Sequence, residues 1–241
     1  MGWRETFDAT PKFVEDFELD PRATALMIID MQYSNAHADY GIGRFLKENY
    51  PEAADYFFNR INEVVIPNQV KLLSLFRKNR MRVTYLTVGP TLPDHSDYKR
   101  PISHEMGEAY VTRKLFGPVG TFEHSILEEL RPRHGELILN KTSAGAFNST
   151  GLDMILRNMG VTHLVIAGVA SHACVETTSR DAADRGYLCV LVDDACAAHT
   201  QELHDGTMRS FAAVSGMVLN TDEIVGALAN QSSSLPAMQQ P

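Results

Sequence analysis

The sequence predicts one α/β domain of three layers, α/β/α, in which helices cover both faces of a mostly parallel sheet of about six strands. Short apolar runs alternate with longer amphipathic segments along the chain, a pattern typical of such sheets. No linker or internal repeat interrupts residues 20–230. We therefore expect an N-terminal extension over 1–20, a single domain over 21–230, and a disordered Ser/Pro/Gln-rich tail over 231–241.

The strands are predicted from apolar runs rich in Val, Ile and Leu. The first run begins at Thr24 and ends at Ile29, directly before Asp30. Runs of this length and composition are typical of strands that are buried on both faces. The predicted strands span residues 24–29, 82–88, 136–139, 162–167, 187–192 and 217–219.

The segments between these runs have the apolar spacing of helices that pack one face on a sheet. Pro67 predicts a kink or a break in the longest of them, and Ser149 and Thr150 can cap a later one. Residues 90–120 are rich in Pro, Gly and His and are interpreted as a functional loop, and residues 32–60 as further loops that wall the pocket. The predicted helices span residues 61–78, 122–130, 149–158, 174–185, 201–215 and 221–229.

Composition excludes several classes of function. A formal charge of −8 offers no basic footprint for nucleic acid. No apolar run approaches the roughly 20 residues that span a bilayer, and the N-terminus lacks the order of a signal peptide. Three cysteines without a CxxC pair indicate a reducing compartment, so a cytoplasmic protein is expected. The N-terminal aromatic residues are expected to pack on the domain or on a partner subunit: Trp3, Phe7, Phe13 and Phe17.

Cys174 is the most reactive candidate residue, because the pattern places it where a buried strand ends and a helix begins. Backbone N–H groups and the helix dipole favour a thiolate at such a position. The alternative is a small apolar cysteine packed under a helix. Asp30 and Lys141 follow two other strands. Ligands bind at the carboxyl ends of parallel strands, so these three side chains are expected to share one site.

Four segments follow one another in a specific order: residues 25–32 (Ala-Leu-Met-Ile-Ile-Asp-Met-Gln), 141–147 (Lys-Thr-Ser-Ala-Gly-Ala-Phe), 168–178 around Cys174, and the helix and strand of 181–195. Together they resemble the isochorismatase-like cysteine hydrolase family. That family includes nicotinamidases, N-carbamoylsarcosine amidases and biuret or ureido hydrolases. The resemblance covers about residues 22–228.

The resemblance implies a catalytic triad in which Cys174 is the nucleophile, Asp30 the general base and acid, and Lys141 the cation. It also implies a cis peptide bond between Val169 and Ala170, and an oxyanion hole formed by the N–H groups of Ala170 and Cys174. A thiol is a better nucleophile than water toward an amide, and a thioester intermediate divides the barrier. Lys141 would offset the repulsion between two neighbouring anions.

Nicotinamidases of this family bind a metal through an Asp-x-His pair and a second His. Here Asp94 and His95 are adjacent and the next histidine is His104, so the spacing does not match and neither metal nor cofactor is expected. His172 could face the pocket, an oligomer interface or solvent. The candidate substrate contacts are Gln32, Tyr33, Asn35, His37, Phe147 and His172.

The sequence thus predicts an amidohydrolase that cleaves a C–N bond of a small carboxamide, N-carbamoyl or ureido compound through a thioester, with release of ammonia or an amine. One alternative is vinyl-ether hydrolysis of the isochorismatase type, which Cys174 disfavours because true isochorismatases commonly lack that nucleophile. The other is a catalytically silent member that binds a small ligand. Family members are often oligomers, so a homodimer or homotetramer is expected.

Overall fold

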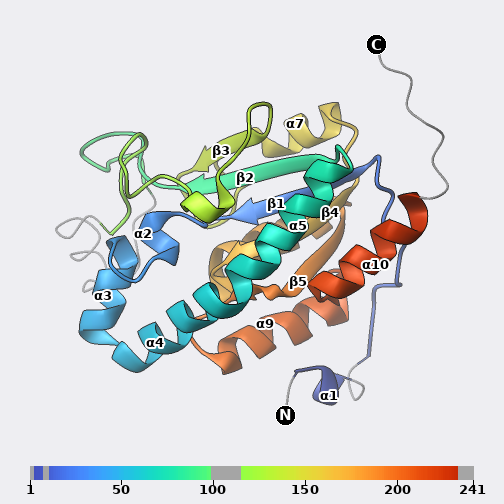
Figure 1. Ribbon diagram of the computed structural model, residues 1–241, viewed down its shortest axis with the longest axis horizontal. Coiled ribbons are helices and arrows are strands. Elements are labelled where there is room, and N and C mark those ends of the chain that lie inside the picture. Colours follow the sequence, from blue (N-terminus) through green and yellow to red (C-terminus); the bar gives the residue numbers. More distant parts are fainter. Residues whose placement is uncertain (1–2, 8–10, 99–114, 233–241) are drawn as a thin grey trace.

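The computed structural model describes residues 3–7, 11–98 and 115–232. Its centre is a six-stranded sheet in the order β3-β2-β1-β4-β5-β6, in which every neighbouring pair is parallel. Helices cover both faces of the sheet (Figure 1), so the predicted three-layer α/β/α class is confirmed. The strands are β1 (Thr24–Ile29), β2 (Arg82–Val88), β3 (Leu137–Lys141), β4 (His163–Val169), β5 (Leu188–Ala197) and β6 (Met217–Leu219).

The helices differ in length and in regularity. Two turns have π-helical hydrogen bonding, η1 (Ile61–Val65) and η3 (Ser171–Val175), and η2 (Glu128–Leu130) is a 3₁₀ turn. The α-helices are α1 (Trp3–Phe7), α2 (Tyr33–Ala36), α3 (Gly41–Asn49), α4 (Pro51–Arg60), α5 (Ile66–Lys78), α7 (Leu152–Asn158), α8 (Glu176–Asp184), α9 (Gln201–Val214) and α10 (Thr221–Ser232).

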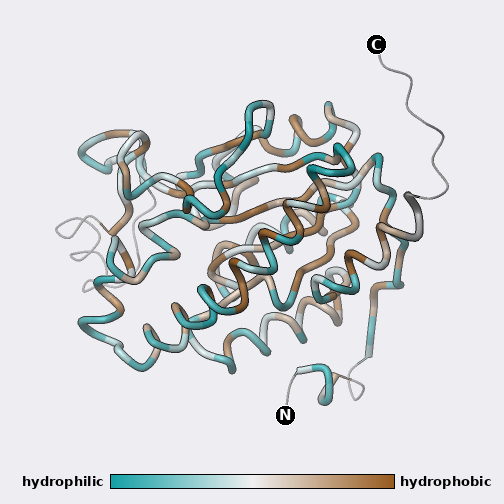
Figure 2. The backbone as a smooth tube through the Cα atoms, viewed as in Figure 1, coloured by the Kyte–Doolittle hydropathy of each residue, from teal (hydrophilic) through white to brown (hydrophobic). Residues whose placement is uncertain are grey.

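Each face of the sheet has its own hydrophobic core. Helices α3, α4, α5 and α10 pack on one face, with Phe57 and Phe76 among their buried side chains. Helices α7, α8 and α9 pack on the other face with Phe211, and the N-terminal Trp3 joins them. Figure 2 shows hydrophobic residues gathered along the central strands and alternating with hydrophilic ones along the helices. That alternation is the amphipathic spacing from which the helices were predicted.

The region after β1 is helical, so the prediction of loops over residues 32–60 was wrong. Pro67 was predicted to kink or break its helix, and the regular helix is indeed interrupted directly before it, although the backbone stays helical on both sides. The chain runs from α4 through the π-helical turn η1 into α5, and this turn absorbs the irregularity.

The predicted helix over residues 122–130 is wrong except for the 3₁₀ turn at its end. This segment pairs with the chain that leaves β1: Gln32 and Ile126 form an antiparallel bridge, and Leu127 N–H donates to Met31 O at 2.9 Å. A long-range pairing of this kind overrides local helical propensity.

The ends of the chain depart from expectation in smaller ways. Among the N-terminal aromatics, Phe13 is 75% exposed, whereas Trp3 and Phe7 join one core and Phe17 packs on the other. Helix α10 continues to Ser232, two residues into the predicted tail, and residues 233–241 lie outside the described residues, as do 99–114 of the predicted loop. Across the described ranges, no helix combines the length and apolar character needed to cross a membrane.

Strands β1 and β4 approach each other closely where Ile29 pairs with Gly168. Gly168 has φ +133°, and a Cβ atom there would lie 2.1 Å from the carbonyl oxygen of Ile29. Only glycine fits this backbone position. Gly168 is followed by Val169, Ala170 and then the turn η3, which carries Cys174.

We predict that Gly168→Ala destabilises the fold by more than about 1 kcal/mol, because both the conformation and the space exclude a side chain. The measurement is urea unfolding followed by circular dichroism. Gly206→Ala is the matched control, since nothing lies within 4 Å of that position in α9, and it should stabilise the fold by about 0.5–1 kcal/mol. Equal effects of the two substitutions would contradict this account of the β1–β4 contact.

Candidate active site

The carboxyl edge of the sheet brings together the three residues that were predicted to share a site. Asp30 follows β1, Lys141 ends β3, and Cys174 lies in the turn η3 after β4. Strand β2 separates β3 from β1, so only a long side chain can reach across it. Lys141 does so, and its Nζ lies 2.8 Å from Asp30 Oδ2.

The Lys141–Asp30 ion pair is shielded from water. The exposed fractions of the two side chains are 0% and 2%. Lys141 Nζ also donates to Ser143 O at 3.1 Å. Asp30 Oδ1, by contrast, has no hydrogen-bond partner in the hydrogen-bond network of the described residues. One carboxylate oxygen is therefore held by the cation while the other remains a free proton acceptor.

Burial and mutual charge shift the pKa of each of these groups. Burial raises the pKa of Asp30, against the charge and hydrogen bond of Lys141 and the nearby Cys174 thiol, which lower it. Burial alone would lower the pKa of Lys141, but the charges of Asp30 and Cys174 outweigh it and raise that pKa. Burial, and then the Asp30 charge, raise the pKa of Cys174 to about 12 even though Lys141 opposes them. This direction is opposite to the one that a strand-to-helix position alone favours, because desolvation is the largest cause of the shift.

The backbone around these residues is unusual. The peptide bond between Val169 and Ala170 is cis. Asp30 has φ +55°, a left-handed conformation that is uncommon outside glycine and asparagine. Its N–H donates to Leu86 O at 2.8 Å, which fixes the residue against the end of β2. Such conformations concentrate at functional sites.

Gln32 and Asn35, two of the candidate substrate contacts, are engaged within the protein. Gln32 is fully buried, and its amide bonds to the backbone N–H and C=O of Val88 and to His124 O. Asn35 Nδ2 donates to Gln32 Oε1 at 3.1 Å. These amides tie the end of β1 to the end of β2.

Tyr33 and His37 belong to an aromatic cluster with two residues that the sequence did not single out, Tyr40 and Phe122. The Tyr33 and Phe122 ring centroids lie 4.4 Å apart, and those of His37 and Tyr40 5.0 Å. Phe122 is 58% exposed. It was missed because residues 122–130 were expected to form a helix elsewhere.

Phe147 and His172 lie in different surroundings. Phe147 packs in the core near Tyr187, with the Arg185 guanidinium carbon 5.0 Å from its ring centroid. The ring centroid of His172 lies 4.8 Å from that of His199, and burial lowers the pKa of both.

His124 is a further residue that sequence reasoning missed. Its Nε2 lies 2.8 Å from Asn140 Oδ1. His124 is also among the groups that lower the pKa of Asp30. Asp94 and His95 lie in a turn whose Asp94 carboxylate accepts from Ser96, and His104 lies outside the described residues. No cluster of three potential metal ligands occurs among the residues that the structure describes.

Residues 24–223 match the family profile described as Isochorismatase domain. The chain belongs to the isochorismatase family. Among curated proteins, the ureidoacrylate amidohydrolase RutB of Acinetobacter baylyi is 29% identical over 220 residues, covering 88% of this chain and 86% of that protein. The protein of the same name from Agrobacterium fabrum is 30% identical over 194 residues, with 77% and 80% covered.

Solved structures share the fold of this family member. A cysteine hydrolase from Pseudomonas syringae pv. phaseolicola superposes with a TM-score of 0.72 at 23% identity, covering 91% of this chain and 98% of that chain. N-carbamoylsarcosine amidase from Thermoplasma acidophilum gives a TM-score of 0.57 at 23% identity, with 83% and 96% covered.

The raised thiol pKa predicts the pH dependence of alkylation. Since the pKa of Cys174 is about 12, the thiolate fraction and the rate of alkylation by iodoacetamide should rise about tenfold per pH unit between pH 7 and 10, without a plateau. Peptide mass spectrometry measures the rate at Cys174, with the buried Cys189 and Cys196 as internal references. A plateau below pH 9 would mean a resting thiolate and would contradict this electrostatic account.

Proposed function

We propose that the chain is a cysteine-dependent amidohydrolase that cleaves a C–N bond of a small N-carbamoyl or ureido compound. The observation that carries the proposal is the water-shielded ion pair of Asp30 and Lys141 beside the Cys174 thiol at the carboxyl edge of the sheet. The names of the relatives support it, since the curated ones are called ureidoacrylate amidohydrolases and one structural neighbour N-carbamoylsarcosine amidase.

In the first step, Cys174 Sγ attacks the carbonyl carbon of the substrate while its proton passes to Asp30. The raised pKa of the thiol requires this coupling, because a free thiolate is rare at neutral pH. The unpartnered Asp30 Oδ1 is the acceptor that remains open for the proton. Lys141 stays charged and stabilises the negative charge shared by Sγ and the carboxylate.

The carbonyl oxygen becomes an oxyanion as the C–S bond forms. We assign its stabilisation to the backbone N–H groups of Ala170 and Cys174. Donors of this kind are worth about 3 kcal/mol each in related chemistry.

The intermediate collapses when Asp30 returns its proton to the substrate nitrogen and the C–N bond breaks. Ammonia or an amine leaves, and the acyl or carbamoyl group remains on Cys174 as a thioester. Asp30 then accepts a proton from water as the water attacks the thioester carbon. That proton returns to Sγ, which regenerates the thiol and releases the acid.

The aromatic cluster of Tyr33, His37, Tyr40 and Phe122 follows β1 and is our candidate wall for the substrate. Vinyl-ether hydrolysis would leave the Cys174 thiol without a use. A silent binding protein would need neither Cys174 nor the Lys141–Asp30 ion pair. The homodimeric or homotetrameric state and the cytoplasmic location stay predictions.

Cys174→Ser should lower turnover by at least about 10³-fold, because a hydroxyl beside the same carboxylate is a far weaker nucleophile than a thiol. The assay measures ammonia release from a panel of N-carbamoyl amino acids, ureido acids, biuret and simple carboxamides. Cys189→Ser is the matched control, since that buried cysteine lies in β5 and its thiol contacts Tyr187 O.

Near-normal turnover by Cys174→Ser would exclude the thioester mechanism. Pyruvate release from isochorismate, without activity on any member of the panel, would establish the vinyl-ether alternative instead. A folded enzyme without any product would favour the ligand-binding alternative.

A further inference from the structure

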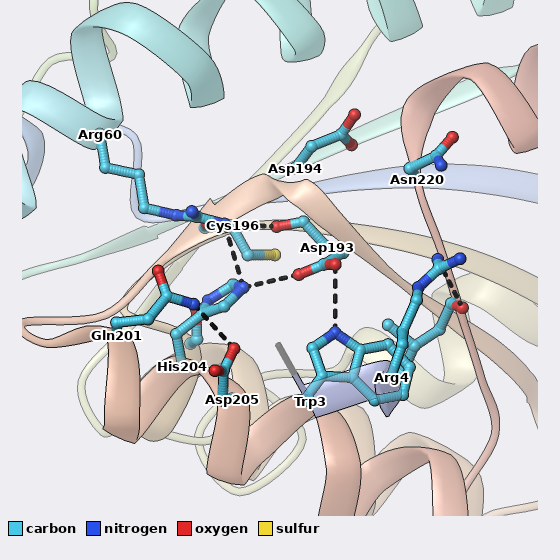
Figure 3. Close-up of polar contacts among 12 residues, drawn as sticks. Trp3, Arg4, Arg60, Asp193, Asp194, Cys196, Gln201, His204, Asp205 and Asn220 are labelled. Carbon is cyan, nitrogen blue, oxygen red and sulfur yellow. Dashed lines mark hydrogen bonds and ion pairs between the residues drawn. The ribbon is translucent and has the colours of Figure 1, made fainter. Parts of the chain in front are cut away.

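A second set of side chains of the types found in catalytic triads adjoins the turn η3, which carries Cys174 (the nucleophile turn). Ser171 Oγ is 3.0 Å from His204 Nδ1, and His204 Nε2 is 2.7 Å from Asp193 Oδ1. Asp193 Oδ2 accepts a further hydrogen bond from Trp3 Nε1 at 3.1 Å (Figure 3). The exposed fractions of Ser171 and His204 are 0% and 1%.

The chemistry of the partners sets the direction of these hydrogen bonds. His204 Nε2 lies 2.7 Å from Asp193 Oδ1, which only accepts, and 3.0 Å from Arg60 Nη2, which only donates. The shorter contact places the hydrogen of Nε2 toward the Asp193 carboxylate. The other nitrogen of a neutral ring, Nδ1, is then an acceptor, and the Ser171 hydroxyl donates to it. The order Ser–His–Asp is that of serine hydrolases. Because Ser171 is fully buried, however, no external substrate reaches its hydroxyl.

We propose that the Asp193–His204–Ser171 chain is a positioning device that holds the nucleophile turn of the hydrolase proposed above, on whose function this inference rests. Ser171 opens the turn η3, directly after Ala170 and three residues before Cys174. Ala170 and Cys174 are the proposed oxyanion donors. A tether at Ser171 therefore acts on the nucleophile and on both donors.

Asp193, the acceptor at the end of this hydrogen-bond chain, lies in a bulge of strand β5. Leu191 pairs with Ile166 and Cys196 with Gly168, so Val192–Ala195 stand opposite a single residue of β4. Four consecutive carbonyl oxygens, those of residues 193–196, accept hydrogen bonds from side chains of α4 and α5. They are Asp193 O and Cys196 O from Arg60 (3.0 Å each), Asp194 O from Asn68 (3.1 Å) and Ala195 O from Gln69 (2.9 Å).

The bulge places Asp193, whose carboxylate reaches His204, in the part of β5 that departs from regular pairing with β4. Burial would raise the pKa of Asp193, but the hydrogen bonds from His204 and Trp3 and the charge of Arg60 outweigh it and lower that pKa. The Asp193 carboxylate thus stays ionised and continues to accept from His204 Nε2, while His204 Nδ1 lies 3.0 Å from Ser171 Oγ. Helix α9, strand β5 and the N-terminal helix α1 are thereby tied to the nucleophile turn.

The test compares Ser171→Ala, His204→Phe and the double variant. Each single substitution should lower kcat by about 10- to 100-fold with KM changed by less than about twofold, because the turn loses its placement and not its substrate contacts. The double variant should fall no further than the singles, since both act through one hydrogen bond. Ser179→Ala is the matched control, because that serine is equally buried and its hydroxyl donates to Glu176 O in its own helix.

A readout without turnover separates this inference from the proposed function. Alkylation of Cys174 by iodoacetamide should slow by the same factor in both single variants and in the double variant, and not in Ser179→Ala. It remains measurable even if no amide is hydrolysed. If His204→Phe does not fold, Asp193→Asn replaces it in the comparison of the single and double variants. Unchanged kcat and unchanged alkylation in Ser171→Ala, additive losses in the double variant, or a loss confined to KM would each overturn the proposal.

Discussion

The buried ion pair between Lys141 and Asp30 is the interaction on which the rest of the site depends. Neither charge is stable alone away from water, and removing one partner of such a pair typically costs about 3–5 kcal/mol. Together they hold a carboxylate beside the Cys174 thiol with little access to water. Burial and the Asp30 charge raise the pKa of that thiol to about 12.

The topology of the sheet makes this pair available. The order β3-β2-β1-β4 places Asp30 on a central strand, between the strand that carries Lys141 and the one that leads to Cys174. Gly168 lets β4 approach β1 closely enough for the turn to reach the carboxylate. The β5 bulge lies on the other side of β4, opposite the segment between Ile166 and Gly168 that leads to that turn.

The strands, and the placement of Asp30, Lys141 and Cys174 at one edge of the sheet, could be predicted from local sequence because both follow from short-range patterns. A buried parallel strand is a continuous apolar run, and a reactive residue at its carboxyl end joins the same sheet edge as its equivalents. The helices of residues 32–60 and the pairing of Ile126 with Gln32 depend on distant contacts and were missed. Phe147, the last residue of the 141–147 segment and a candidate substrate contact, packs near Tyr187.

The sequence by itself therefore determined the α/β class, the order of the strands along the chain and the identity of Asp30, Lys141 and Cys174 as neighbours. Only the tertiary structure decided the direction of their pKa shifts, because desolvation depends on everything packed around a group and raises the pKa of Cys174, which a helix terminus alone would lower. It also decided the hydrogen bonds among Ser171, His204 and Asp193. These residues lie on separate elements, and their hydrogen bonds exist only once β5, α9 and the nucleophile turn have packed together.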